Sequence, residues 1–292
     1  METTELLKKV RKIEIKTRGL STQVFSGEYH SAFKGRGMTF SEVREYQPGD
    51  DIRTIDWNVT ARLKNLFVKV FEEERELTVM LLVDVSASKS FGTKQQLKQD
   101  IITEICAVLA FSAIQNNDKI GVIFFSDKIE KFIPPKKGKS HILRIIRELI
   151  TFEPENKGTN ISLALKYFTN VIKKRSTAFI LSDFIDENFN DAIKIANKKH
   201  DLVALQIYDE REKELPDVGL IKLLDAETGE SKWVDTSNSE VRKRYITQAL
   251  KFDKNLSEIL RKSGVDFAKI GTHQSYVQPL MNLFKRREHQ KK

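Results

Sequence analysis

Three oxygen-bearing side chains follow a long apolar run at a spacing that suits a metal ion. The run from Val79 to Val83 is wholly apolar, and Asp84, Ser86 and Ser88 come directly after it. Such a run is typical of a strand buried on both faces, so polar oxygens appear only where the strand emerges. One carboxylate and two hydroxyls on alternate residues can direct their oxygens to one point, as a hard divalent cation requires. The pattern predicts a cation site at the carboxyl edge of a parallel sheet, where open α/β sheets usually bind ligands.

Two further residues are placed to complete this site. Thr159 stands just before a predicted helix, so its hydroxyl lies in a loop at the sheet edge. Asp183 follows a second apolar run and ends another predicted strand. Two parallel strands would bring Asp84 and Asp183 to the same edge. The alternative interpretation is structural: the hydroxyls cap helices and Asp183 only ends a strand.

Strands and helices are predicted to alternate from residue 77 onward. Strands are expected at 77–85, 119–125, 177–181, 202–207 and 265–269, with a short edge strand at 129–133 closed by two prolines. Helices are expected at 94–116, 141–150, 161–174, 190–199 and 238–262 and from 275 onward, and a β-hairpin at 219–234. This alternation indicates βαβ crossovers and an α/β fold, with a mostly parallel sheet flanked by helices.

Residues 1–76 differ in character from this pattern. They open with a short amphipathic helix that includes Leu7 and Val10, and they continue in a stretch rich in Gly, Arg and acidic residues. A half-exposed strand is predicted at 66–71. We therefore expect two domains. Residues 1–76 form an N-terminal helix and an irregular, β-containing segment that packs on the core, and residues 77–292 form the α/β domain with a basic C-terminal tail.

Residues 44–62 alternate in charge sign around Trp57. Pro48-Gly49-Asp50 supplies a turn, because proline fixes φ and glycine accepts positive φ. One interpretation is a layer of paired charges that packs on the sheet edge, and the other is a partner-binding surface. The sequence leaves both open. The residues concerned are Arg44, Tyr46, Asp50, Arg53, Asp56, Trp57 and Arg62.

The composition is that of a protein with a sizeable core. Of the 292 residues, 40% are hydrophobic and 9% aromatic, and the mean hydropathy is -0.41. No run of 18 apolar residues occurs, and the first residues lack the apolar core of a signal peptide, so a cytoplasmic location is expected. The one cysteine, Cys106, excludes an intrachain disulfide, and its apolar helical stripe favours buried packing over a reactive role.

The charge of the chain leaves one alternative function open. Lys and Arg number 50 against 41 Asp and Glu, for a formal net charge of +9, and part of this excess lies in residues 285–292. Such a tail is either solvated or an electrostatic contact surface. A nucleic-acid-binding protein is therefore an alternative, although no base-reading motif is visible.

The set of Asp84, Ser86, Ser88, Thr159 and Asp183 resembles the metal-ion-dependent adhesion site of von Willebrand factor A domains, whose Asp-x-Ser-x-Ser, Thr and Asp elements come in this order. The resemblance implies that the three hydroxyls bind Mg²⁺ directly, with Mn²⁺ or Ca²⁺ as alternatives, and that the two carboxylates act mostly through bound water. Mg²⁺ requires near-octahedral oxygen ligands and keeps some of its water. An acidic side chain from a partner could then complete the shell.

A second resemblance extends over the whole chain. Residues 37–57 followed by Ala61-Arg62 resemble the hallmark of a bacterial family of unassigned function, which carries a von Willebrand A-like domain after this segment. Members are usually encoded beside MoxR-type AAA+ ATPases. Many also carry N-terminal transmembrane helices, and none is visible in this sequence.

Together these features favour a metal-dependent protein–protein interaction module, an adaptor or cofactor of a MoxR-type AAA+ ATPase in protein complex assembly or maturation. The expected partner is that ATPase or a client protein presenting an acidic residue. An enzyme is not expected, because no general base stands beside the predicted metal; a metal-dependent hydrolase is the second alternative. Gly138-Lys139-Ser140 resembles the end of a P-loop, but Ile133 stands where that motif needs glycine.

Overall fold

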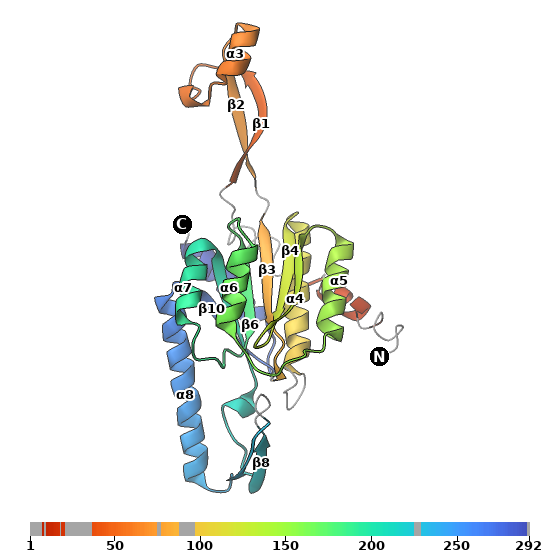
Figure 1. The fold of residues 1–292 in the computed structure, drawn as a ribbon, viewed down its shortest axis with the longest axis vertical. Helices are drawn as coiled ribbons and strands as arrows, with labels where there is room; N and C mark the ends of the chain where they lie inside the picture. The colour runs from red at the N-terminus through yellow and green to blue at the C-terminus, as the bar shows by residue number, and fades with distance from the viewer. Residues whose placement is uncertain are drawn as a thin grey trace. The chain divides into compact units, whose positions relative to one another are not determined.

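The computed structural model describes residues 8, 10–17, 19–20, 37–74, 77–87, 97–224 and 229–290 (Figure 1). The chain divides into two compact units. The smaller unit is Phe33–Leu77, and the larger unit is Met1–Ala32 together with Thr78–Lys292. Within the described ranges, no helix combines the length and the apolar character needed to cross a bilayer.

A six-stranded sheet forms the centre of the larger unit. Its strand order is β10-β7-β6-β3-β4-β5, and all neighbours are parallel except β4 and the edge strand β5. The strands are β3 (Thr78–Asp84), β4 (Lys119–Phe125), β5 (Ile129–Lys136), β6 (Thr177–Ser182), β7 (Asp201–Tyr208) and β10 (Asp266–Gly271). The predicted α/β fold class with a mostly parallel sheet is confirmed.

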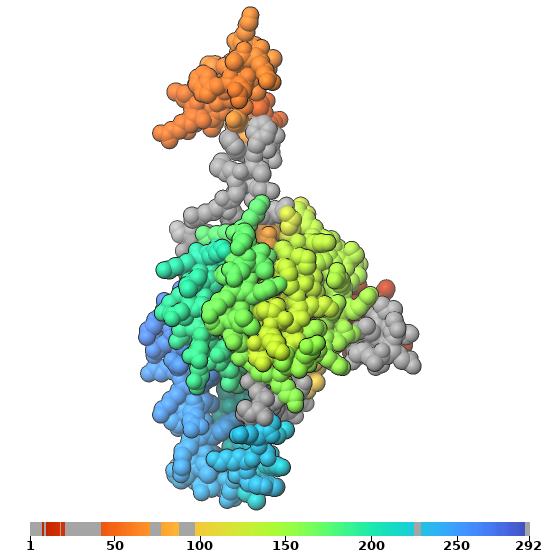
Figure 2. All heavy atoms as spheres, viewed as in Figure 1, coloured from red at the N-terminus to blue at the C-terminus, as the bar shows by residue number. Residues whose placement is uncertain are grey.

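Helices cover both faces of this sheet. On one face lie α4 (Lys98–Gln115), α5 (Lys139–Thr151) and α9 (Val277–Gln290), and Phe179 of β6 packs edge-on against Phe284 of α9 there. On the other face lie α6 (Ile161–Val171), α7 (Asn190–Lys199) and α8 (Ser239–Lys262), which pack on a core that includes Met80 and Ile180. Figure 2 shows the outer surface of α6 and α7 on this face, in green to teal. Burial on both faces explains why the strands are almost purely apolar.

The boundaries of most elements agree with the sequence-based expectation, and one strand differs. β5 continues past Ile133 through Pro134 and Pro135 to Lys136. Proline is tolerated there because β5 is an edge strand with no further neighbour to bond. The close approach of this strand also requires Gly121 on β4, since a Cβ on that residue would lie 2.8 Å from the carbonyl oxygen of Ile133.

Residues 10–17 are helical, as predicted, but they belong to the larger unit. The Nζ of Lys16 lies 2.6 Å from an oxygen of Glu104 on α4, and Glu14 pairs with Lys139 of α5 at 2.6 Å. These ion pairs correct the expected domain of residues 1–76, since its helix groups with the α/β sheet.

The smaller unit is built on a β-hairpin. β1 (Gly37–Glu45) pairs antiparallel with β2 (Phe67–Glu74), and between them come the 3-10 helix η1 (Ile52–Thr54) and α3 (Trp57–Leu63). Of the side chains described in this unit, only Ile55 and Val68 are buried. Most of its surface is therefore open to solvent or to another molecule.

A second hairpin extends the larger unit. β8 (Leu220–Leu224) pairs antiparallel with β9 (Ser231–Asp235), which confirms the hairpin predicted at 219–234. The 3-10 helix η3 (Glu210–Glu212) precedes it, directly after the carboxyl end of β7. η3 therefore lies at the edge of the sheet where the candidate site is expected.

The helix predicted from 275 onward is confirmed as α9, which continues to Gln290 through most of the basic residues 285–292. Arg287 of α9 is 4% exposed, and its guanidinium lies 2.5 Å from Asp201 and 3.0 Å from Asp266. Arg286 donates a hydrogen bond to the carbonyl oxygen of Phe267 at 3.1 Å. These two arginines therefore bind inside the chain, at the amino ends of β7 and β10.

Arg287→Ala is expected to lower the free energy of unfolding by about 1.5–3 kcal/mol, because it removes the hydrogen-bonded partner of two partly buried carboxylates. Urea unfolding followed by circular dichroism measures this change. The neighbouring exposed Arg286→Ala is the control and should cost less than about 1 kcal/mol. Equal losses in the two variants would contradict the structural role of Arg287.

Candidate functional site

The carboxylate of Asp84 is buried at the end of β3. Its residue is 4% exposed, and the hydroxyl of Ser182 donates a hydrogen bond to Asp84 Oδ2 at 2.6 Å. The backbone N–H of Ser86 donates another to Oδ1 at 2.9 Å. Both carboxylate oxygens are thus fixed in position at the carboxyl edge of the parallel sheet.

The pairing of β3 with β6 brings a second carboxylate beside the first. Val83 and Leu181 are register partners, so Asp84 stands opposite Ser182, and Asp183 follows one residue later, close enough for its charge to act on Asp84. Both aspartates are almost fully buried. Burial, and next the charge of Asp183, raise the pKa of Asp84 to about 7. The two carboxylates therefore repel each other in a poorly solvated place.

The loops that carry the predicted hydroxyls meet at the same edge. Ser86 is fully buried and Thr159 is half-buried. The N–H of Ala87 donates to the carbonyl oxygen of Lys157 at 3.0 Å, which holds the two loops together. The side chain of Asn160 supplies the N-cap of α6, so the structural alternative in which Thr159 caps that helix is wrong. The fifth predicted ligand, Ser88, lies outside the described residues.

A buried lysine also reaches this cluster. Lys98 of α4 is 2% exposed, and its Nζ lies 3.1 Å from Asp183 Oδ2; it also donates to Glu212 of η3. Burial alone would lower the pKa of Lys98, but the charges of Asp183 and Glu212 outweigh that effect and raise it. The lysine is therefore held as an ammonium against Asp183.

Three residues of this cluster escape sequence reasoning, namely Lys98, Ser182 and Glu212. Lys98 is separated from Asp183 by 85 residues and from Glu212 by 114, and no local motif marks such a contact. For Ser182 there is a weak indication of a site role, because its hydroxyl directly precedes the carboxylate of Asp183 at the end of an apolar strand.

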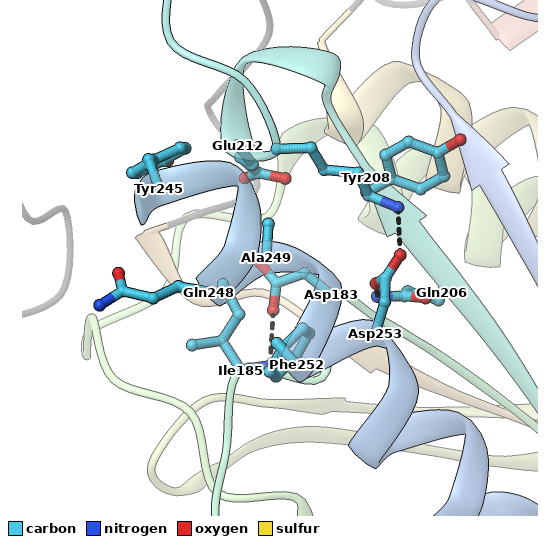
Figure 3. Close-up of a pocket in the computed structure, with 11 residues that line it drawn as sticks. Asp183, Ile185, Gln206, Tyr208, Glu212, Tyr245, Gln248, Ala249, Phe252 and Asp253 are labelled. Carbon is cyan, nitrogen blue, oxygen red and sulfur yellow. Dashed lines mark hydrogen bonds and ion pairs between the residues drawn. The ribbon is translucent and has the colours of Figure 1, made fainter. Parts of the chain in front are cut away.

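A cavity of about 690 Å³ opens beside Asp183 (Figure 3). Ile185, Tyr208, Phe252 and Glu212 are among the residues that line it, from the ends of β6 and β7, from η3 and from α8. Its far wall holds Asp253, which pairs with Lys213 at 2.7 Å. The cavity is large enough for a side chain of another molecule to lie next to the carboxylate pair.

The donor set fits a hard divalent cation. Asp84 and Asp183 supply negative charge, and Ser86 and Thr159 carry neutral hydroxyl oxygens of the kind such ions accept. A cation would also offset the repulsion between the two carboxylates. Among the described residues, no three His, Cys, Asp or Glu side chains gather in a way that could hold a metal. A cation here would therefore depend on hydroxyls, water and an oxygen from a partner.

In the smaller unit, several charged residues of the 44–62 segment hold the local fold. Arg44 makes two hydrogen bonds of 2.7 Å to the carboxylate of Asp50, and these bonds are the largest cause that lowers the pKa of Asp50. Asp56 caps α3 by accepting from the N–H of Asn58 at 3.0 Å. Arg44, Asp50 and Asp56 therefore have structural roles.

Other residues of that segment are accessible. Trp57 is 64% exposed, so the paired charges of this segment do not enclose it. Arg53 and Arg62 are exposed as well, and Tyr46 is half-buried. Ile52, at 68% exposed, adds apolar surface. This part of the smaller unit presents an aromatic and basic surface to solvent.

Asp84→Asn is expected to stabilise the metal-free protein at pH 8 by roughly 1–2 kcal/mol. Folding raises the pKa of Asp84 from 3.8 to about 7, so the folded state keeps a proton that the unfolded state has lost. The stabilisation of the folded state by this bound proton is complete below about pH 4 and is lost as the pH rises through about 7. Asparagine removes that loss, while its carbonyl oxygen can still accept from the N–H of Ser86 and its amide group can donate to the hydroxyl of Ser182.

Urea unfolding at pH 5 and pH 8, in buffer without divalent metal, measures the effect. Asp127→Asn, at an exposed residue of the same sheet edge, is the control. The interpretation is contradicted if wild type and Asp84→Asn lose the same stability between the two pH values.

Comparisons with known proteins assign the family. A family model described as "Protein of unknown function DUF58" matches residues 42–255. The chain is 30% identical over 232 residues to protein Mb1516 of Mycobacterium bovis and to protein Rv1480 of Mycobacterium tuberculosis, and each match covers 78% of this chain and 73% of the relative. The structure of an aerotolerance-related membrane protein from Bacteroides fragilis is similar, with a TM-score of 0.50 and 14% identity over 73% of this chain and 99% of that one. That likeness supports the fold alone, whereas the sequence matches show that the chain belongs to the DUF58 family.

Proposed function

We propose that this chain is a metal-dependent protein–protein interaction module. The observation that carries the proposal is the pair of buried carboxylates, Asp84 and Asp183, at the sheet edge where the loops of Ser86 and Thr159 meet. In this proposal these four residues and Ser88 hold Mg²⁺, or Mn²⁺ or Ca²⁺ in its place.

The chain's own residues would prepare the site for a partner. The hydroxyl of Ser182 and the N–H of Ser86 orient Asp84, and the N–H of Ile185 orients Asp183 at 3.2 Å. When bound, the cation supplies positive charge that a partner's carboxylate can meet. The cavity beside Asp183 would receive the neighbouring side chain of that partner, which adds selectivity to the contact.

We further propose that the partner is a MoxR-type AAA+ ATPase, or a client protein that presents an acidic residue, and that the chain acts as adaptor or cofactor in protein complex assembly or maturation in the cytoplasm. This part rests on the resemblance of residues 37–62 to the family encoded beside such ATPases. The exposed Trp57, Arg53 and Arg62 offer a second contact surface. A binding role is proposed instead of catalysis, because the proposal assigns both carboxylates of the pair to the cation and Glu212 to Lys98.

The nucleic-acid alternative is less favoured by the structure. Arg286 and Arg287 are the arginines of the expected basic tail, and both make contacts within the chain. The positive charge available there for phosphate contacts is correspondingly smaller.

Asp84→Ala is expected to weaken binding to the MoxR-type ATPase of the source organism at least about tenfold in the presence of Mg²⁺, a loss of about 1.4 kcal/mol or more. Biolayer interferometry with the full chain and the nucleotide-bound ATPase measures the affinity. Such ATPases hold Mg²⁺ with their own nucleotide, so chelation would disturb both proteins. The substitution therefore gives the cleaner comparison.

Asp127→Ala, at an exposed residue of the same edge, is the matched control and should bind as wild type does. Circular dichroism confirms that each variant is folded. Equal affinity of wild type and Asp84→Ala would contradict metal-dependent docking, and no binding by wild type would contradict the choice of partner.

A further inference from the structure

The buried lysine of the candidate site has two acceptors. Lys98 is the first residue of α4 and is 2% exposed. Its Nζ donates to Asp183 Oδ2 at 3.1 Å and also to Glu212. A fully buried lysine is rare unless it is paired. Here one of its partners belongs to the candidate metal site and the other does not.

Carboxylates outnumber ammonium groups in this cluster. Asp84, Asp183 and Glu212 are three carboxylates, and the ammonium of Lys98 is shared between two of them, whereas the nearby Lys213 pairs with Asp253. A single ammonium shared between two acceptors leaves negative charge in excess. A divalent cation can therefore bind, but it would lie beside Asp183 together with the ammonium of Lys98, which repels it.

Glu212 is placed to keep the lysine when Asp183 takes another partner. Its carboxylate accepts from the N–H of Asp209 at 2.9 Å, which fixes it on η3. Glu212 and Asp183 both line the cavity beside the site (Figure 3). The ammonium could thus lose Asp183 without becoming an unpaired buried charge, which would otherwise cost several kcal/mol.

We propose that Lys98 is a tethered counter-ion of the metal site, which neutralises Asp183 in the metal-free protein and is retained by Glu212 when a divalent cation binds. This inference rests on the proposed function, because it presumes the metal site. Lys98 opposes the bound cation and keeps its affinity low. A partner's carboxylate offsets that repulsion, so cation and partner favour each other's binding.

Isothermal titration of the full chain with Mg²⁺ tests this role. Lys98→Met is expected to bind Mg²⁺ at least about tenfold more tightly than wild type, because Asp183 loses its competing ammonium. Lys98→Arg keeps the charge and should bind as wild type does. Glu212→Gln should bind Mg²⁺ more weakly than wild type, since Lys98 then pairs with Asp183 alone.

A second comparison keeps the test valid if Lys98→Met does not fold. The double variant Lys98→Met/Glu212→Gln removes the lysine without leaving Glu212 unpaired, and it should bind Mg²⁺ more tightly than Glu212→Gln. If wild type binds Mg²⁺ but removal of Lys98 leaves the Mg²⁺ affinity unchanged or lowers it, the proposed role of Lys98 is overturned and the metal site is not. No Mg²⁺ binding by folded wild type, Lys98→Met and double variant would overturn the metal site itself.

Discussion

The repulsion between Asp84 and Asp183 follows directly from strand pairing. Because β3 and β6 are parallel neighbours with Val83 opposite Leu181, the carboxylate that ends β3 and the one that directly follows β6 lie at the same edge of the sheet. Neither can turn to solvent, since helices cover both faces and the residues are almost fully buried. The rest of the site is arranged around this repulsion, through hydrogen bonds that orient the carboxylates and one ammonium that partly neutralises them.

The fold holds this unfavourable arrangement because the register of the two strands is fixed by their burial in the core. β3 and β6 are apolar on both faces, so a shift in register would place no better set of side chains in the core. At the opposite edge of the sheet, Arg287 joins the beginnings of β7 and β10 through Asp201 and Asp266. One edge is thus closed by ion pairs between Arg287 and two carboxylates, and the other keeps negative charge in excess. Buried groups with shifted pKa values are typical of functional sites.

Much of this arrangement could be predicted from the sequence. Uninterrupted apolar runs mark buried strands, and the residues after them, Asp84 and Asp183, mark the site edge. Contacts that no strand end marks could not be predicted, and Lys98 is the main example, because its acceptors are far away in the sequence. Arg287 was missed for the opposite reason, since a basic chain end without an apolar run looks solvated. The exposure of Trp57 could not be decided, because alternating charges suit a packed layer and a partner-binding surface alike.

Diffraction from crystals of the full chain grown with Mn²⁺, recorded at the manganese absorption edge, tests the central claim most directly. The account predicts one anomalous peak between Asp84 and Asp183, within coordination distance of the hydroxyls of Ser86 and Thr159, and Lys98 directed to Glu212. The account would be contradicted by crystals at saturating Mn²⁺ that show no peak there and keep Lys98 against Asp183.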